Sequence, residues 1–230
     1  PALLNLLCGP DLSLAWLEQF VAGIRASCER YGVSIVGGDV SQLEAGQFTA
    51  SLTLTGNTQL EPALRATAAI GDAIYVTGAL GGTLLAKHLD FEPRMEEGRW
   101  LAGQPACSAM MDLTDGLGKD LAALLPEGSS AAIERKNLPV SEDARRCARQ
   151  DGQSAEAHVF CDGEDYELLF TLSRGTDTEA FEASWRARFP KLTITRIGLI
   201  VAAQPSGRYV DSGSGEALPW QSGFEHFRKA

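Results

Sequence analysis

The segment Met110-Met111-Asp112-Leu113-Thr114-Asp115-Gly116-Leu117 decides how this chain is interpreted, because an apolar approach ends in two carboxylates and a glycine. The apolar residues before the first carboxylate are typical of a buried strand, and the residues from about Leu117 to Leu125 are typical of a helix. A strand, a turn and a helix in this order favour a mixed α/β or α+β protein over a helical bundle or a β-sandwich.

The turn between this strand and this helix carries the oxygen atoms that a hard cation prefers. Asp112 and Asp115 can bind Mg²⁺ together with water and phosphate oxygens, and Thr114 can hydrogen-bond a phosphate. If the helix begins near Asp115 or Gly116, its first N–H groups are also free to bind an anion. The alternative is structural: Asp115 caps the helix and Asp112 occupies an ordinary turn.

The rest of the chain continues this mixture of element types. A helix is expected from Ser13, which can cap it, to Tyr31, with Gly32 at its end. Residues 48–55 alternate strictly between apolar and polar side chains, which predicts a strand with an apolar and a polar face. Further strands are expected at 1–7, 33–36, 73–77, 167–172 and 192–201, helices at 83–89 and 178–189, and a helix with a surface loop within 135–153. A domain boundary is placed near residue 66.

Two glycine-rich stretches are further candidates for ligand contacts. Gly37-Gly38-Asp39 follows an expected strand, so that the backbone could approach a ligand closely, although the same residues are also ordinary turn chemistry. The stretch 78–82 resembles a phosphate loop only superficially, because it lacks both the G-K-[ST] ending and the G-x-G-x-x-G spacing. Close packing of a strand on a helix is the preferred interpretation of those glycines.

Four carboxylates lie within six residues in Asp162-Gly163-Glu164-Asp165-Tyr166-Glu167, just before an expected strand. Such acids repel one another unless cations, donors or water compensate, so a solvated turn is one interpretation. In a pocket, Glu164 could instead accept from a cationic or amine-bearing substrate. The C-terminal stretch 220–227 is unusually aromatic for a tail, which suits either core packing or a stacking wall for a heteroaromatic ring.

Composition limits the classes of function. The 230 residues include 20 Lys+Arg and 30 Asp+Glu, so the net charge of −10 argues against non-specific nucleic-acid binding. No apolar run approaches the roughly 18–20 residues of a membrane span, and no membrane partner is expected. The five cysteines are widely spaced and form no C-x-x-C pair, which argues against disulfides and zinc and favours a reducing cytoplasm.

Taken together and in order, these motifs resemble thiamine-monophosphate kinase, a family within the aminoimidazole-ribonucleotide-synthetase-like superfamily of ATP-using enzymes. The resemblance rests on Gly37-Gly38-Asp39, the strand after Gly71-Asp72, the segment 112–117, Gly163-Glu164-Asp165-Tyr166-Glu167-Leu168 and Gly223-Phe224-Glu225-His226-Phe227. It implies a two-domain architecture: residues 1–66 would be the remainder of an N-terminal domain that binds ATP and Mg²⁺ and dimerises, and residues 67–230 a C-terminal α/β domain.

The resemblance also implies an activity and a set of site residues. The family transfers the terminal phosphoryl group of ATP onto thiamine monophosphate, and the full-length enzyme is expected to be a homodimer. The implied assignments are Mg²⁺ for Asp39, Asp112 and Asp115, ATP for Gly38, Asp39, Arg65 and Thr114, thiamine for Glu164 and Phe224, and catalysis for Arg65 and Asp115.

The chain also departs from the family pattern. The family's N-terminal segment carries a Gly-Asp-Asp cluster that holds metals, and nothing before Gly38 contains it. We therefore expect an incomplete first domain and little kinase activity from these 230 residues alone. Two alternatives stay open: a relative in the superfamily that acts on another substrate, and a non-catalytic binding or regulatory protein that kept the fold.

Overall fold

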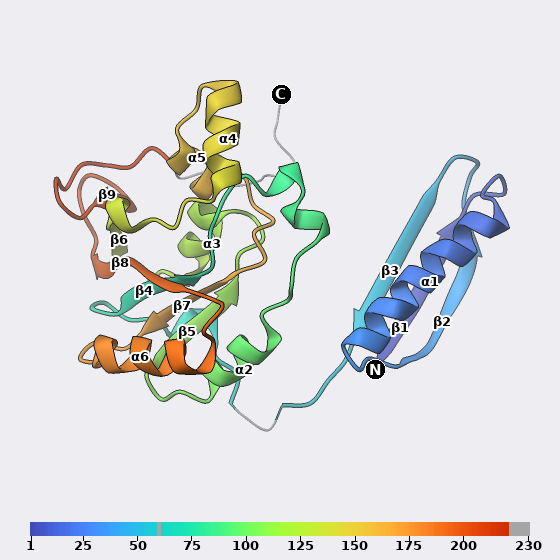
Figure 1. Cartoon of the computed structure of the whole chain (residues 1–230), viewed down its shortest axis with the longest axis horizontal. Coiled ribbons are helices and arrows are strands. Elements are labelled where there is room, and N and C mark those ends of the chain that lie inside the picture. Colours follow the sequence, from blue (N-terminus) through green and yellow to red (C-terminus); the bar gives the residue numbers. More distant parts are fainter. Residues whose placement is uncertain (59–60, 221–230) are drawn as a thin grey trace. The chain divides into compact units, whose positions relative to one another are not determined.

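The computed structural model describes residues 1–58 and 61–220, and it divides the chain into two compact units, Pro1–Gln59 and Leu60–Ala230 (Figure 1). The boundary expected near residue 66 lies inside the second unit, beside the short 3₁₀ turn η1 (Arg65–Thr67). None of the helices within the described ranges combines the length and the apolar character that a bilayer span requires. All five cysteines lie within those ranges, and none of them forms a disulfide.

The first unit is a three-stranded sheet with one helix along a face. Its elements are β1 (Ala2–Cys8), α1 (Leu14–Arg30), β2 (Ile35–Gln42) and β3 (Phe48–Leu54). The strand order is β2-β1-β3, with β2 parallel and β3 antiparallel to β1. Figure 1 shows α1 lying along this sheet, and the rings of Trp16 and Phe20 on α1 pack 4.9 Å and 5.0 Å from the ring of Phe48 on β3.

The local signals in this unit predict its elements well. Ser13 caps α1 by accepting a hydrogen bond from the backbone N–H of Trp16 at 3.2 Å, so the expected helix is confirmed. The alternating residues 48–54 form β3, which is also confirmed. Three apolar residues of β3 lie directly opposite three apolar residues of β1. The opposed pairs are Phe48 with Cys8, Ala50 with Leu6 and Leu52 with Leu4.

The segment Gly37-Gly38-Asp39 differs from the expectation. We expected a short buried strand at 33–36 that ends before it, but these residues lie inside β2, whose side chains are exposed throughout. Gly38 adopts a φ of 156°, and a Cβ at this position would collide with the carbonyl oxygen of Leu4 on the neighbouring strand. Close pairing of β1 with β2 therefore requires this glycine, and the turn interpretation is wrong.

The second unit is a six-stranded sheet with helices on both faces. The sheet order is β5-β7-β4-β8-β6-β9, antiparallel except for the parallel pair β6–β9. Its strands are β4 (Ala73–Thr77), β5 (Cys107–Asp112), β6 (Ser129–Ile133), β7 (Leu168–Leu172), β8 (Ile194–Ala202) and β9 (Tyr209–Asp211). Its helices are α2 (Met95–Ala102), α3 (Leu117–Leu124), α4 (Glu142–Asp151), α5 (Ala155–Cys161) and α6 (Thr178–Arg188), with a 3₁₀ turn η4 (Arg135–Asn137).

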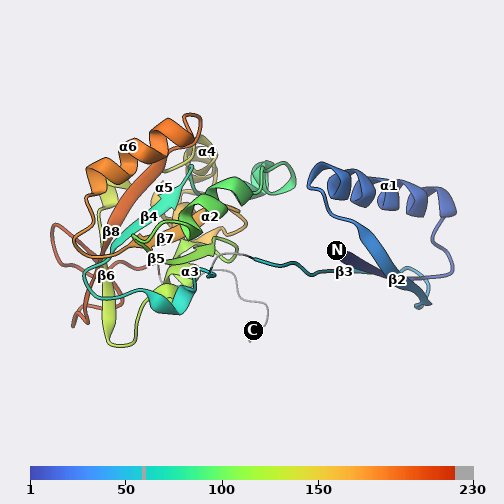
Figure 2. The same ribbon diagram turned by 90° about the horizontal axis from the view of Figure 1, so that it is seen from below.

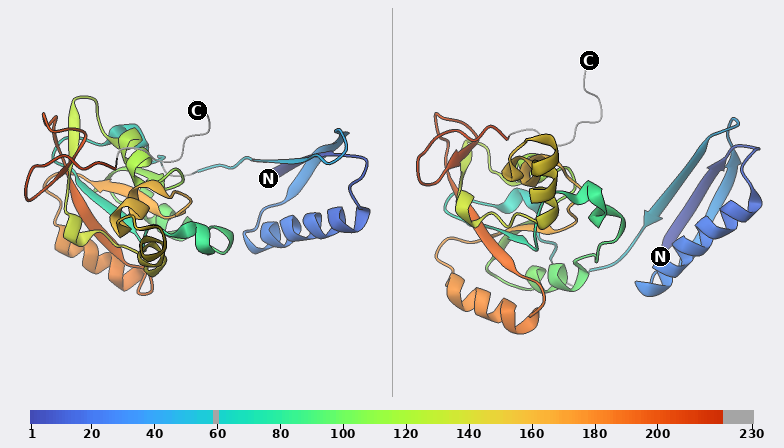
Figure 3. Two further views of the ribbon diagram at one scale, coloured as in Figure 1. Left: turned by 90° about the horizontal axis from the view of Figure 1, so that it is seen from above. Right: turned by 45° about the horizontal axis from the view of Figure 1, so that its top comes forward.

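The central strand β4 divides the core into two layers. Ile74 and Val76 face one hydrophobic cluster, which includes residues of α3 and α5, and Tyr75 faces the other, which includes Trp185 of α6. Figure 2 shows α6 and α3 on opposite sides of the sheet, and Figure 3 shows α4 and α5 together at one end of the unit. The expected strand at 73–77 and the mixed fold class are therefore confirmed.

The helix expected at 83–89 is wrong. Two 3₁₀ turns replace it, η2 (Thr83–Leu85) and η3 (Lys87–Leu89), because the intervening Ala86 has a φ of −173° that interrupts helical geometry. Sequence analysis also missed α2, α5, β6 and β9.

Candidate functional site

The turn after β5 forms the first part of the candidate site. β5 ends at the exposed Asp112, and α3 begins at Leu117 with Gly116 as its N-cap residue. Asp115 therefore does not cap the helix. Its carboxylate instead forms an ion pair of 2.7 Å with Lys119, four residues further along. The capping alternative for Asp115 is wrong. Asp112 ends β5 and Asp115 lies in the turn that follows it, so both carboxylates stand at one end of the sheet.

Asp120 fixes this turn from inside the protein. Its side chain is 4% exposed, and its Oδ2 accepts hydrogen bonds from the backbone N–H groups of Thr114 at 2.8 Å and Asp115 at 3.0 Å. Burial raises the pKa of Asp120, and these two hydrogen bonds oppose the rise. Because Asp120 occupies both N–H groups, they are not available to an anion. This role of Asp120 could not be predicted from local sequence patterns, since it depends on how α3 folds back onto the turn.

The acidic segment 162–167 lies directly against this turn. The N–H of Glu164 donates to the carbonyl oxygen of Thr114 at 2.7 Å, and the N–H of Tyr166 donates to that of Leu113 at 2.9 Å. Glu164 and Tyr166 hold the left-handed φ values of 53° and 52°, which cost free energy for residues other than glycine and cluster at functional sites. The structure therefore brings Glu164 and Thr114 together, although 50 residues separate them in the sequence.

The two other aspartates of this segment are internal anchors. Asp165 is fully buried and accepts the N–H of Gly81 at 2.8 Å, and Asp162 accepts the N–H of Gly82 at 2.8 Å. Asp162 also accepts from His158 Nδ1 at 3.0 Å, which helps to raise the pKa of His158 against the opposing effect of burial. The glycine-rich stretch thus donates its N–H groups to carboxylates, and the solvated-turn interpretation of 162–167 is wrong.

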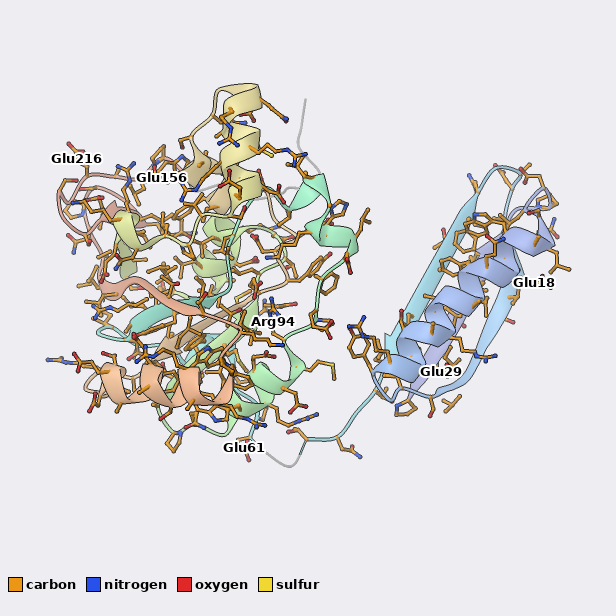
Figure 4. All side chains as sticks on the ribbon, viewed as in Figure 1. Glu18, Glu29, Glu61, Arg94, Glu156 and Glu216 are labelled. Atoms are coloured by element: carbon orange, nitrogen blue, oxygen red, sulfur yellow. The ribbon has the colours of Figure 1, made fainter. Side chains whose placement is uncertain are left out.

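Glu167 lies at the centre of a buried ion cluster that sequence analysis missed. Arg94 donates to both carboxylate oxygens at 2.7 Å and 2.8 Å, Thr77 donates at 2.7 Å, and Lys87 lies at 3.2 Å. Burial acts to raise the pKa of Glu167, but these donors outweigh it and hold the pKa below its usual range. A Cβ at Gly78 would collide with this carboxylate. Figure 4 labels Arg94, whose side chain points into the second unit.

The remaining predicted site residues lie elsewhere. Asp39 is exposed on β2 of the first unit and accepts from Ser41 Oγ at 2.8 Å. Arg65 is exposed on η1 of the second unit, where Thr67 bonds the carbonyl oxygen of Ser108 near the start of β5. At about 3.3 Å per residue, Ser108 is roughly 13 Å from Asp112 along the strand. Phe224 lies outside the described residues.

The carboxylates that remain accessible suit a hard cation by their chemistry. Asp112 and Asp115 offer oxygen ligands at a strand end, as Mg²⁺ prefers. Within residues 1–58 and 61–220, however, no three His, Cys, Asp or Glu side chains converge closely enough to hold a metal ion.

Comparison with known proteins decides the family. Residues 1–58 match the family model described as AIR synthase related protein, N-terminal domain. The thiamine-monophosphate kinase of Rhodopirellula baltica is 35% identical over 205 residues, which cover 89% of this chain and 62% of that protein. The thiamine-monophosphate kinase of Salmonella typhimurium is 30% identical over 251 residues, which cover 99% of this chain and 74% of that protein. The chain belongs to the thiamine-monophosphate kinase family.

Solved structures of the family agree with this fold. The thiamine monophosphate kinase from Aquifex aeolicus superposes with a TM-score of 0.72 at 26% identity, over 94% of this chain and 74% of that one. A complex of AaThiL with AMPPCP and TMP gives a TM-score of 0.71 at 27% identity. The hydrogenase maturation protein HypE shares the fold at 19% identity, with a TM-score of 0.69. The mixed α/β fold class that the resemblance implied is thereby confirmed.

Proposed function

We propose that this protein transfers the terminal phosphoryl group of ATP to thiamine monophosphate, giving thiamine diphosphate and ADP. The observation that carries the proposal is the 2.7 Å hydrogen bond between Glu164 and Thr114, because it joins the residue assigned to thiamine to the turn assigned to phosphate and metal. The family relatives carry this name, and the AaThiL complex holds an ATP analogue together with TMP.

The reaction brings two phosphate anions to a site that itself carries carboxylates, so positive charge has to be supplied. We assign Asp112 and Asp115 of the second unit as Mg²⁺ ligands, and Asp39 of the first unit is a separately proposed Mg²⁺ ligand. When bound, Mg²⁺ neutralises charge between the two phosphate groups. Lys119 already neutralises part of the charge of Asp115 in the protein itself, through an ion pair of 2.7 Å.

The chain's own residues position the reactants. In the second unit, Thr114 offers a hydroxyl to a phosphate oxygen of ATP, and Arg65 is a further proposed nucleotide contact. Gly38 and Asp39 are the nucleotide contacts proposed for the first unit. The nucleophile is an oxygen of a phosphate that is already anionic, so the transfer needs no general base. Catalysis then consists of positioning and of charge stabilisation, to which Arg65 and Asp115 contribute.

Glu164 accounts for the choice of acceptor. The thiazolium ring of thiamine is cationic, and the carboxylate of Glu164, whose backbone is hydrogen-bonded to the phosphate turn, attracts it. The fixed backbone of Glu164 means that little ordering is needed on binding. Phe224 is proposed to offer an aromatic surface to the same substrate. A homodimeric assembly and a cytoplasmic location stay predictions.

Titration calorimetry on the Glu164→Gln variant tests this assignment. Loss of the charge should remove about 1.4 kcal/mol or more of the binding free energy of thiamine monophosphate, which corresponds to binding that is roughly tenfold weaker or more. ATP binding should change less than twofold. The matched control is Glu127→Gln, which removes an exposed glutamate in the turn between α3 and β6. Equal losses for both ligands would indicate a structural role for Glu164, and no binding of thiamine monophosphate by the unmodified protein would contradict the proposed function.

A further inference from the structure

Two stacked aromatic rings stand beside Glu164. The ring of Tyr166 lies 4.1 Å from the ring of Phe91, centre to centre, with an angle of 21° between the ring planes. Both residues stay partly exposed although their rings are in contact. The proposed function assigns no role to either ring.

The position of Tyr166 is fixed from both sides. Asp165 and Glu167, its sequence neighbours, are buried at 0% and 1% exposure and hold Gly81 and Arg94 through hydrogen bonds. The Tyr166 N–H is held by the carbonyl oxygen of Leu113 at 2.9 Å. In this segment the partly exposed Glu164 and Tyr166 therefore alternate with buried anchors. The aromatic ring and the Glu164 carboxylate are thus presented from one rigid turn.

The electrostatic surroundings of this ring favour a cation. Burial raises the pKa of the Tyr166 phenol, and the negative charges of Glu164 and Asp112 raise it further. The phenol therefore lies within the electrostatic reach of both carboxylates. An aromatic face beside a carboxylate such as that of Glu164 attracts a planar cation and repels an anion.

We propose that Phe91 and Tyr166 form the aromatic wall against which the cationic heteroaromatic ring of the acceptor lies, with Tyr166 as a specificity-determining residue. This inference rests on the proposed function, since it assigns the acceptor to the side of the turn that carries Glu164. In this arrangement the carboxylate neutralises the ring's charge and the aromatic pair contacts its plane. The phosphate of the same substrate then extends toward Thr114, whose carbonyl oxygen is bonded to Glu164.

Calorimetric titration of the full chain with thiamine monophosphate, and separately with ATP, tests this wall. Tyr166→Leu removes the ring and should raise the Kd for thiamine monophosphate roughly five- to tenfold, the size of a partly desolvated cation–aromatic contact. Tyr166→Phe keeps the ring and should stay within about twofold of the unmodified protein. Phe91→Leu should give a smaller increase than Tyr166→Leu, because Tyr166 retains its own ring. Neither leucine variant should change the Kd for ATP by more than about twofold.

The control is Tyr31→Leu, which removes a partly exposed ring at the end of α1 in the first unit. Circular dichroism establishes folding, and if Tyr166→Leu does not fold, Phe91→Leu and Tyr166→Phe carry the test. Unchanged binding of thiamine monophosphate by the folded leucine variants would overturn the inference, and so would equal losses for both ligands. If Glu164→Gln weakens that binding while the leucine variants do not, the proposed function stands and only the wall is refuted.

Discussion

Replacing Asp165 with asparagine removes a buried carboxyl group and leaves its shape almost unchanged. Asp165 is fully buried, its Oδ1 accepts the N–H of Gly81, and its Oδ2 has no hydrogen-bond partner among the described residues. Burial is the main cause that raises its pKa from 3.8 to about 7, with smaller contributions from Glu167 and Asp162. Asparagine keeps an acceptor for Gly81 but cannot ionise.

The expected effect follows from proton linkage. Between about pH 4 and pH 7 the unfolded chain has lost this proton while the folded protein still holds it. Each pH unit in that window therefore lowers the free energy of unfolding by about 1.4 kcal/mol. The whole window amounts to about 4 kcal/mol, and the part between pH 5 and pH 8 to about 3 kcal/mol. Asp165→Asn lacks this dependence, so its stability relative to the unmodified protein should rise by about 3 kcal/mol over that range.

Urea unfolding at pH 5, 6, 7 and 8 measures this difference. A Trp16→Phe background removes the tryptophan of the first unit, so that fluorescence reports on Trp100, Trp185 and Trp220 of the second. Asp90→Asn, at an exposed position, is the matched control and should show no such trend. Parallel stability curves for Asp165→Asn and the unmodified background would refute the assignment of a raised pKa to this buried carboxyl.

Two further substitutions probe the anchors of the same region. Glu167→Gln leaves Arg94 without its carboxylate partner, so the free energy of unfolding should fall by about 3 kcal/mol, as for other broken buried pairs. A decrease of less than about 1 kcal/mol, measured by urea unfolding, would contradict this prediction. His158 holds a raised pKa because Asp162 accepts from it, so its stabilising effect is present below about pH 6.5 and is lost as pH rises through the folded-state pKa. His158→Gln should therefore lose less stability between pH 6 and pH 9 than the unmodified protein, and identical losses would argue against a charged His158.

Sequence reasoning succeeded where a structure is set by neighbouring residues. Ser13 caps α1 through the Trp16 N–H three residues on, and the alternation at 48–54 depends only on the two faces of one strand. It failed at β6, whose residues Ser129–Ile133 are small or polar at four of five positions and carry little apolar periodicity. It also failed at 83–89, where the side chains follow a helical pattern but the backbone is interrupted at Ala86, between two 3₁₀ turns.

In the candidate site, too, residues in local patterns could be predicted from the sequence, and contacts between distant residues could not. The carboxylates at 112 and 115 could be chosen from a local strand–turn–helix pattern. Glu164 could be proposed from its acidic segment as a partner for a cationic substrate, and the family resemblance assigned it to thiamine. The partners of Asp165 and Glu167 are 84 and 73 residues away in the sequence, at Gly81 and Arg94. No local periodicity reports such pairings, so the distinction between internal anchors and accessible acids within 162–167 became visible only in the folded chain.

Phosphorus NMR of a reaction that contains the full-length protein, ATP, Mg²⁺ and thiamine monophosphate tests the proposed function most directly. The γ-phosphate signal of ATP should fall in step with the appearance of ADP and thiamine diphosphate. Neither product should form when thiamine monophosphate is left out. ATP consumption that yields inorganic phosphate, or that does not depend on thiamine monophosphate, would contradict the proposed phosphoryl transfer.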